Sequence, residues 1–264
     1  MLLLWRPTVG AGHTSEEGAG QDGQHQHNEA DSFEQAKPLG VEEHLGKTIP
    51  MDLLFVDEEN TPVLLKELIQ KPTLILPVYF HCPDRCPLLI SNLADALNDV
   101  VFKAGQDFQV IIFSFDPDDT PEYAFKAKEN YSQLLDKDFP PSAWRFLTGG
   151  RGAIEGLTGA MGFGYQQTAK HFFNHPSVLV VTSASGKITR YVYGPDFLPF
   201  DISMALSEAA KGTPGVSIKK LLTFCFSYDP AGKKYVFNTF KIVAISTLVI
   251  IVLFYFFVLR KGNK

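Results

Sequence analysis

The chain has 264 residues, a formal net charge of −5 and a sequence pI near 5.8. With 45% hydrophobic and 20% charged residues, its composition is that of a globular chain and excludes a disordered or fibrous protein. The acidic balance excludes a basic surface for nucleic acid. Three cysteines are too few for a disulfide scaffold.

The N-terminal segment, residues 1–38, is predicted to be a flexible tail, because it is rich in Gly, Glu, Gln and His and poor in large apolar side chains beyond its first residues. His25 and His27 lie close together there, and a solvated linker is favoured over weak metal scavenging. The opening MLLLW is too short for the apolar region of a signal peptide. If the domain is exported, either the true start of the protein lies upstream, or the later membrane span directs insertion of the chain.

Residues 39–212 are predicted to form one domain that begins with extended segments. The segment 51–68 predicts a strand, a turn and a second extended piece. The short apolar run 72–80 is typical of a strand buried on both faces. Since proline cannot donate a ladder hydrogen bond, Pro77 predicts a bulge or a missing bond in that strand.

The rest of the domain alternates helical and extended patterns. Apolar residues at helical spacing predict a helix that starts at Pro87, and Thr120 followed by Pro121 predicts the start of another. The remaining elements are a strand at 108–115, a short strand at 144–150, a helix at 152–163, a two-stranded hairpin at 177–194 and a last helix ending at Gly212. This order predicts an α/β fold, a mixed sheet flanked by helices.

The C-terminal residues 242–259 contain no charged side chain and would be about 27 Å long as a helix, enough to cross a bilayer. Apolar side chains on all sides, with lysines at both ends, favour a membrane span over a buried core helix. Residues 213–241 are then a linker to the membrane, and residues 260–264 a short basic tail. Positive charges are equally numerous on both sides, so they do not orient the span.

The sequence YFHCPDRCP places Cys82 and Cys86 four residues apart, between a buried strand and a helix. A helix N-terminus favours thiolate over thiol. Side chains four residues apart meet on the first turn, so both sulfurs can bind one ion or oxidise together. A structural disulfide is disfavoured because closing so short a loop contributes little.

The sequences YFHCPDRCP, FSFDPDDTPE, FLTG and NHPSVLVVTSASGKITRYVYG, in this order, resemble the Sco/SenC family of thioredoxin-like copper-binding proteins over residues 39–212. The resemblance implies a thioredoxin-like fold and a copper site formed by Cys82, Cys86 and the distal His175. Thiolates suit Cu(I), and an imidazole makes the site acceptable to Cu(II). Three ligands leave the site open, unlike a structural zinc site with four.

The other polar residues of these motifs are expected to have lesser roles. His175 precedes a buried strand, and Pro176 stands where thioredoxin-like folds carry a proline that faces their cysteines. His171 is a weaker candidate ligand, and His81 at most supports one. The carboxylates of residues 116–120 are better explained by a strand-to-helix turn with a capping threonine than by a site for a hard metal.

Two features depart from the family pattern. The membrane span is C-terminal, whereas the usual Sco anchor is N-terminal, and a segment containing Cys225 lies between the domain and the span. Cys225 is favoured as a buried apolar residue over an auxiliary thiol.

Three functions remain open. The favoured one is a membrane-tethered copper chaperone, not an enzyme, that delivers copper to the binuclear centre of a cytochrome c oxidase subunit on the extracytoplasmic side, as the resemblance implies. Other copper chaperones or thiol reductants are then further partners. The second is a thiol–disulfide oxidoreductase that uses Cys82 and Cys86 as its redox pair. The third, a peroxiredoxin-like peroxidase, is favoured only by the general fold.

Overall fold

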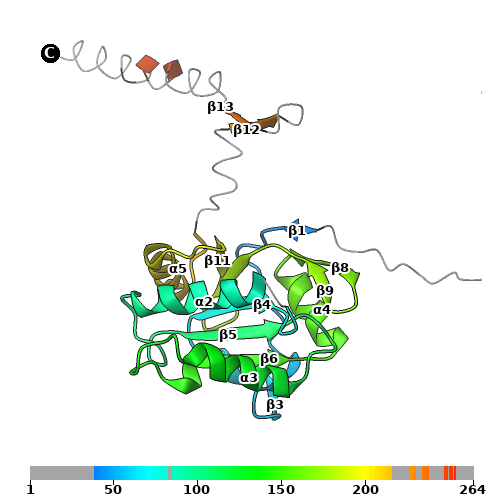
Figure 1. Ribbon diagram of the computed structural model, residues 1–264. Helices are drawn as coiled ribbons and strands as arrows, with labels where there is room; N and C mark the ends of the chain where they lie inside the picture. The colour runs from blue at the N-terminus through cyan, green and yellow to red at the C-terminus, as the bar shows by residue number, and fades with distance from the viewer. Residues whose placement is uncertain are drawn as a thin grey trace, which may run out of the picture. The chain divides into compact units, whose positions relative to one another are not determined.

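A seven-stranded mixed sheet forms the centre of the molecule (Figure 1). The computed structural model describes residues 39–82, 85–215, 226–229, 234–237, 247–248, 250–251 and 253. The strand order is β11-β10-β4-β5-β6-β2-β3. The bounds are β2 Leu54–Asp57, β3 Pro62–Leu64, β4 Thr73–Val78, β5 Gln109–Ser114, β6 Trp144–Thr148, β10 Val178–Thr182 and β11 Ile188–Tyr193. The predicted mixed sheet is confirmed.

The two central strands, β4 and β5, are buried along their whole length and run parallel, with Thr73 opposite Gln109 and Val78 opposite Ser114. Parallel neighbours need a crossover, which is usually a helix. Here α2 (Arg85–Asn98) connects β4 to β5, and α3 (Pro121–Ser132) lies between β5 and the parallel strand β6. The carboxyl ends of β4 and β5 therefore meet at one edge of the sheet.

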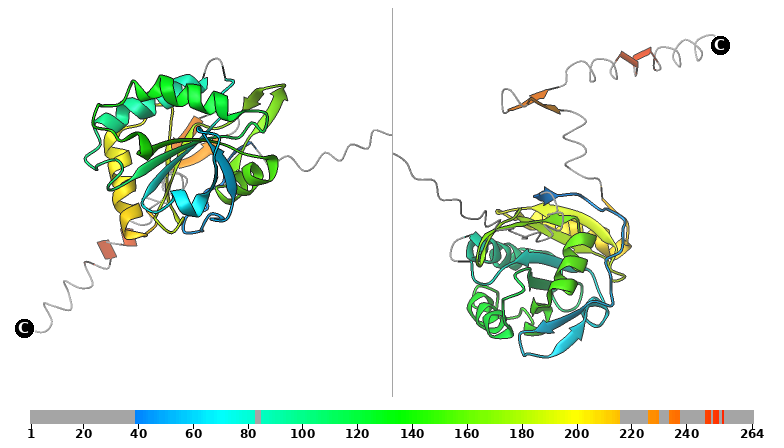
Figure 2. Two further views of the ribbon diagram at one scale, coloured as in Figure 1. Left: turned by 90° about the horizontal axis from the view of Figure 1, so that it is seen from below. Right: turned by 90° about the vertical axis from the view of Figure 1, so that its right-hand side faces the viewer.

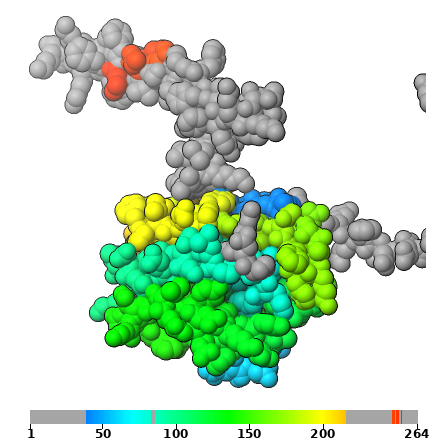
Figure 3. All heavy atoms as spheres, in the orientation of Figure 1, coloured from blue at the N-terminus to red at the C-terminus, as the bar shows by residue number. Residues whose placement is uncertain are grey.

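The helices α2 and α3 pack side by side and cover one face of the sheet (Figure 2). The last helix, α5 (Pro199–Lys211), packs against β10 and β11 and ends at Gly212, which is left-handed with φ 62°. On the face drawn in Figure 3, the surface of α2 lies between those of α5 and α3. The shorter helices are α1 (Leu65–Leu68), a 3-10 turn (Pro141–Ala143) and α4 (Arg151–Ala160).

Two local expectations concern Pro77 and the start of α2. Pro77 stays in register opposite Phe113 of β5, so the expected bulge is absent there. The pairing of β4 with β10 covers only Thr73 to Ile75 and ends before Pro77, which agrees with the alternative of a missing bond. The helix α2 begins at Arg85 and not at Pro87. A proline in the first turn is tolerated since the N–H groups of that turn have no partner within the helix.

Two small antiparallel pairs stand outside the main sheet: β1 (Gly40–Val41) with β7 (Phe163–Gly164), and β8 (Gln166–Ala169) with β9 (Phe172–Asn174). The hairpin β8–β9 was not predicted, because its turn residues, Lys170 and His171, lack the Gly, Asn or Asp that usually mark such turns. His171 takes the left-handed conformation there, with φ 58°.

The C-terminal part of the chain is described only in short pieces, which include the antiparallel strands β12 (Phe226–Asp229) and β13 (Lys234–Phe237). In the described part of the chain, no helix has both the length and the apolar character needed to cross a membrane. Most of the span predicted at 242–259 lies outside the described residues, as do the tail 1–38, the basic tail 260–264 and Cys225.

A buried charge network joins the turn after β2 to β6 and α3. Arg145 Nε is 3.0 Å from Glu58 Oε1, and its Nη2 is 2.6 Å from Asp57 Oδ2. Lys128 Nζ pairs with the same Glu58 oxygen, and the other oxygen of Glu58 accepts the Phe146 N–H at 3.0 Å. Both carboxylates are buried, so removal of one cation leaves charge without compensation in the interior.

We expect Arg145→Met to lower the free energy of unfolding by about 2–4 kcal/mol, because Asp57 would lose its ion pair and Glu58 would keep Lys128 alone. The matched control is Lys126→Met, which removes an exposed ion pair with Glu122 and should change stability little. Urea unfolding followed by circular dichroism gives both values. Equal midpoints for the two variants would contradict the role of the network.

Candidate metal centre

The two cysteines of the predicted site lie where β4 leads into α2. Cys82 and Cys86 form no disulfide with one another, and both residues are buried, with 8% and 2% of their surfaces exposed. The backbone N–H of Cys86 donates to Cys82 Sγ at 3.4 Å. The two cysteines therefore meet, as their spacing predicts, but only Cys86 lies in the first turn of α2, and Cys82 contacts it from the segment just before the helix.

The distal histidine reaches this pair from the segment before β10. His175 Nε2 lies 3.6 Å from Cys86 Sγ, although 89 residues separate them in the chain. The other ring nitrogen, Nδ1, is 3.0 Å from the carbonyl oxygen of Pro176. A carbonyl only accepts, so Nδ1 carries the proton and Nε2 presents its lone pair toward the sulfur. Metal-binding histidines are usually oriented by such a hydrogen bond.

Aromatic side chains surround the imidazole of His175. The centroids of Phe115 and Tyr79 lie 5.2 and 5.7 Å from its ring centroid, and that of Phe163 lies 6.3 Å away. Tyr79 and Phe115 are themselves buried. These rings restrict the orientation of the imidazole and lower the local polarity, which strengthens any interaction with an ion.

A pocket of about 650 Å³ opens on the site, and Cys82 and His175 line it with Tyr79 and Phe173. Cys86 is more deeply buried than Cys82 and is not among the lining residues. An ion that enters by this pocket therefore meets Cys82 and His175 first.

The ionisation of the pair differs from the expectation for a helix N-terminus. The hydrogen bond with Cys82, followed by burial, raises the pKa of the Cys86 thiol far above its ordinary value. Burial, followed by a hydrogen bond to Cys82, raises the pKa of Tyr79 as well. At Cys86 the partial charge of the helix end is outweighed, because a second sulfur and a dry environment both oppose the thiolate. A metal ion that bound Cys86 Sγ would have to displace its proton.

The other candidate residues lie in a neighbouring cluster. His171 Nδ1 is 2.9 Å from Asp116 Oδ2, and His81 Nδ1 pairs with Asp119 Oδ1. The rings of His81 and His171 are stacked with centroids 4.5 Å apart.

The motifs of the sequence assign no role to Tyr79 and Phe115, two of the aromatic residues around His175. The signal that could have indicated them is their position, because each comes directly after a buried strand that ends at the site.

The chain matches known proteins over this domain. The family model described as SCO1/SenC matches residues 42–206. A putative electron transfer protein from Aquifex aeolicus is 32% identical, with a TM-score of 0.57, and the match covers 63% of this chain and 95% of that protein. A second Aquifex aeolicus structure, a putative electron transport protein, is 28% identical, with a TM-score of 0.53 and coverages of 63% and 99%.

Arabidopsis thaliana ScoI, solved with copper bound, is 20% identical with a TM-score of 0.50, and the match covers 63% of this chain and 98% of that protein. This likeness concerns the fold. The comparison with curated proteins returns no match. Together, these comparisons and the mixed sheet agree with the predicted thioredoxin-like architecture.

The pKa of Cys86 can be tested by alkylation of the reduced, metal-free chain with iodoacetamide from about pH 7 to about pH 11. Because only the thiolate reacts, the rate at Cys86 should still rise at the upper end, where an ordinary thiol has levelled off. Cys82→Ala removes the first cause of the raised pKa, so its profile should shift to lower pH. Mass spectrometry of the Cys86 peptide measures the rates.

Steric protection alone would predict a different result, namely a low rate of alkylation at every pH, with an ordinary midpoint that Cys82→Ala does not move.

The raised pKa of Cys86 also makes the stability of the fold depend on pH. Since the thiol of the unfolded chain ionises first as pH rises, the contribution of Cys86 to folding is complete below its unfolded pKa and declines above it.

Proposed function

Because the chain belongs to the SCO1/SenC family, we propose that it is a copper chaperone that binds copper through Cys82, Cys86 and His175. The observation that carries this proposal is the approach of His175 Nε2 to within 3.6 Å of Cys86 Sγ, beside the sulfur of Cys82. Two sulfurs and one imidazole nitrogen, drawn from distant parts of the chain, converge on one point.

The chemistry of these ligands suits copper that is carried and then released. Thiolates are soft ligands that favour Cu(I), and the imidazole also makes Cu(II) acceptable. A site with three ligands leaves a position where a ligand of the acceptor can enter before the ion leaves. The pocket lined by Cys82 and His175 is the natural side for that exchange.

The acceptor in this proposal is the binuclear copper centre of a cytochrome c oxidase subunit. Residues 242–259 would anchor the chain in the lipid bilayer and residues 213–241 would connect this anchor to the domain of residues 39–212. The domain would lie on the extracytoplasmic side, with residues 260–264 inside. Other copper chaperones would supply the metal, and thiol reductants would keep the pair reduced.

A second candidate function is thiol–disulfide exchange by the same pair. It is favoured by the hydrogen bond between the side chains of Cys82 and Cys86, which are buried and form no disulfide with one another. In that reaction the two thiols lose two electrons and two protons to a disulfide of the target, which becomes two thiols, and a Cys82–Cys86 disulfide forms. The raised pKa of Cys86 opposes a fast reaction at neutral pH, because the thiolate is the attacking species.

We expect the reduced full chain to bind one Cu(I) ion that is lost in the Cys82→Ser/Cys86→Ser variant. His175→Ala should weaken Cu(II) at the thiolates much more than Cu(I), because two thiolates alone hold Cu(I), whereas Cu(II) favours added nitrogen. Competition with a Cu(I) chelator and the sulfur-to-copper charge-transfer absorption of Cu(II) measure the two affinities.

The matched control for this experiment is His44→Ala, which changes a partly buried histidine bonded to the Ala160 carbonyl. It should leave both affinities unchanged. Undiminished Cu(I) binding by the double serine variant would refute the proposed site, and equal losses for Cu(I) and Cu(II) in His175→Ala would refute the role of the imidazole.

The topology is tested by adding protease to intact spheroplasts that express the full chain. The domain should be digested, and the C-terminal tail, detected by an epitope after Lys264, should stay protected. Deletion of residues 242–259 should release a domain that still binds copper but delivers it poorly to a membrane acceptor. Digestion of the tail with protection of the domain would invert the topology and reject delivery on the extracytoplasmic side.

A further inference from the structure

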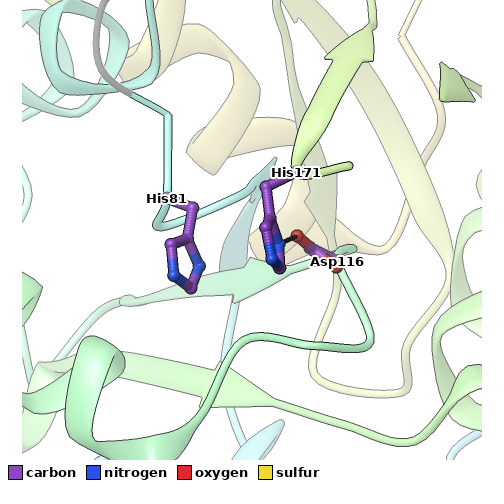
Figure 4. Close-up of side chains that lie close together, drawn as sticks. All are labelled: His81, Asp116 and His171. Atoms are coloured by element: carbon purple, nitrogen blue, oxygen red, sulfur yellow. Dashed lines mark hydrogen bonds and ion pairs between the residues drawn. The ribbon is translucent and has the colours of Figure 1, made fainter. Parts of the chain in front are cut away.

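A cluster of two histidines and one aspartate lies beside the cysteine pair and is built from three separate segments (Figure 4). His81 follows β4 and directly precedes Cys82, Asp116 follows β5, and His171 lies at the turn of the hairpin β8–β9. One potential ligand atom from each lies within 4.8 Å of the other two. We propose that this cluster is a second metal site, which takes a divalent ion of the copper(II) and zinc class.

The two imidazoles are each oriented by a buried carboxylate. Asp119 Oδ1 pairs with His81 Nδ1, while its Oδ2 accepts the Phe80 N–H at 2.6 Å and the hydroxyl of Ser114. Asp116 Oδ2 lies 2.9 Å from His171 Nδ1, while its Oδ1 accepts the Asp118 N–H at 3.0 Å. Asp119 therefore holds His81 as an outer carboxylate commonly holds a metal-binding histidine, whereas Asp116 is itself a candidate ligand that already lies against His171.

The charge of the cluster favours a cation. Asp116 and Asp119 are 1% and 6% exposed, and their ion-pair partners in the described part of the chain are these two histidines. Two buried carboxylates therefore lie beside two imidazole nitrogens. A divalent ion would compensate the negative charge of Asp116 directly and that of Asp119 through His81.

The ligand types separate this cluster from the thiolate site. Two imidazoles and a carboxylate are borderline to hard ligands, which suit Cu(II) or Zn(II), whereas the two sulfurs suit Cu(I). Bonds of about 2.0–2.1 Å at tetrahedral angles place ligand atoms roughly 3.3 Å apart, so the cluster must contract by on the order of 1 Å to bind an ion. The side chains of His81 and His171 are each 25% exposed, which leaves them room to move.

The alternative is that the histidines only stack. His81 lies against Tyr123, with centroids 4.0 Å apart, as well as against His171 at 4.5 Å, and such packing needs no metal. Stacking alone, however, does not explain why His171 lies in a left-handed turn with its Nδ1 beside the buried carboxylate of Asp116. The two explanations differ in what the chain binds when the cysteines are absent.

The test uses the full chain with its three cysteines changed to serine and with His13, His25 and His27 changed to glutamine, so that neither thiols nor tail histidines take up the probe. Cu(II) is titrated and followed by electron paramagnetic resonance. We expect one ion with coupling to two nitrogens, and displacement of that ion by Zn(II). Because no thiol remains, this result does not depend on the proposed copper chaperone site.

His171→Asn and His81→Gln in this background should each weaken Cu(II) binding by roughly tenfold or more and remove one nitrogen coupling. Asparagine tolerates the left-handed turn, so the first variant keeps the hairpin. The matched control, His44→Asn, should leave affinity and couplings unchanged. Binding that depends on His44, or uptake that is the same with and without His171, would overturn the second site.

Discussion

The site depends on the register of three strands. Because β4 and β5 are parallel, their carboxyl ends meet, and because β10 runs antiparallel to β4, its start lies at the same edge. Cys82 follows β4 and His175 precedes β10, so backbone pairing far from the sulfurs sets the 3.6 Å approach between the imidazole and Cys86. A slip of one residue in either pairing would reverse the faces of the strand and separate the ligands.

Burial determines how readily the groups at this edge of the sheet ionise. The sulfurs and the imidazole lie among aromatic rings, and the pKa of the Cys86 thiol is raised by its hydrogen bond with Cys82 and by burial. A helix N-terminus alone would favour the opposite. At the proposed copper site, a soft ion would have to displace the Cys86 proton, so the energy of the metal–sulfur bonds would drive loading. Without metal, Cys86 is a weak nucleophile at neutral pH, because only the thiolate attacks.

Two groups of ligands share one edge of the sheet but differ in type. Cys86 lies in the first turn of α2 and Cys82 just before that helix, whereas His81, next to Cys82 in the chain, turns toward Asp119 and the ring of His171. Adjacent residues of an extended segment point to opposite sides, so one short stretch after β4 contributes to both groups. The proposed chaperone site is soft and the proposed second site is borderline, and ions of different charge would be sorted between them by ligand type alone.

The sequence by itself determined most of the elements of the sheet and its helices, and it named the candidate ligands. Uninterrupted apolar runs marked β4 and β5, helical spacing marked α2, and the motifs around Cys82, Cys86 and His175 pointed to a copper site, because these signals are local or lie in a recognisable order. The sequence did not predict the hairpin β8–β9, since its turn lacks the usual turn residues. It also did not predict the buried environment of the thiols. Only the tertiary structure decided that burial opposes ionisation of Cys86 and that His81, Asp116 and His171 meet, because both depend on contacts between segments that are distant in sequence.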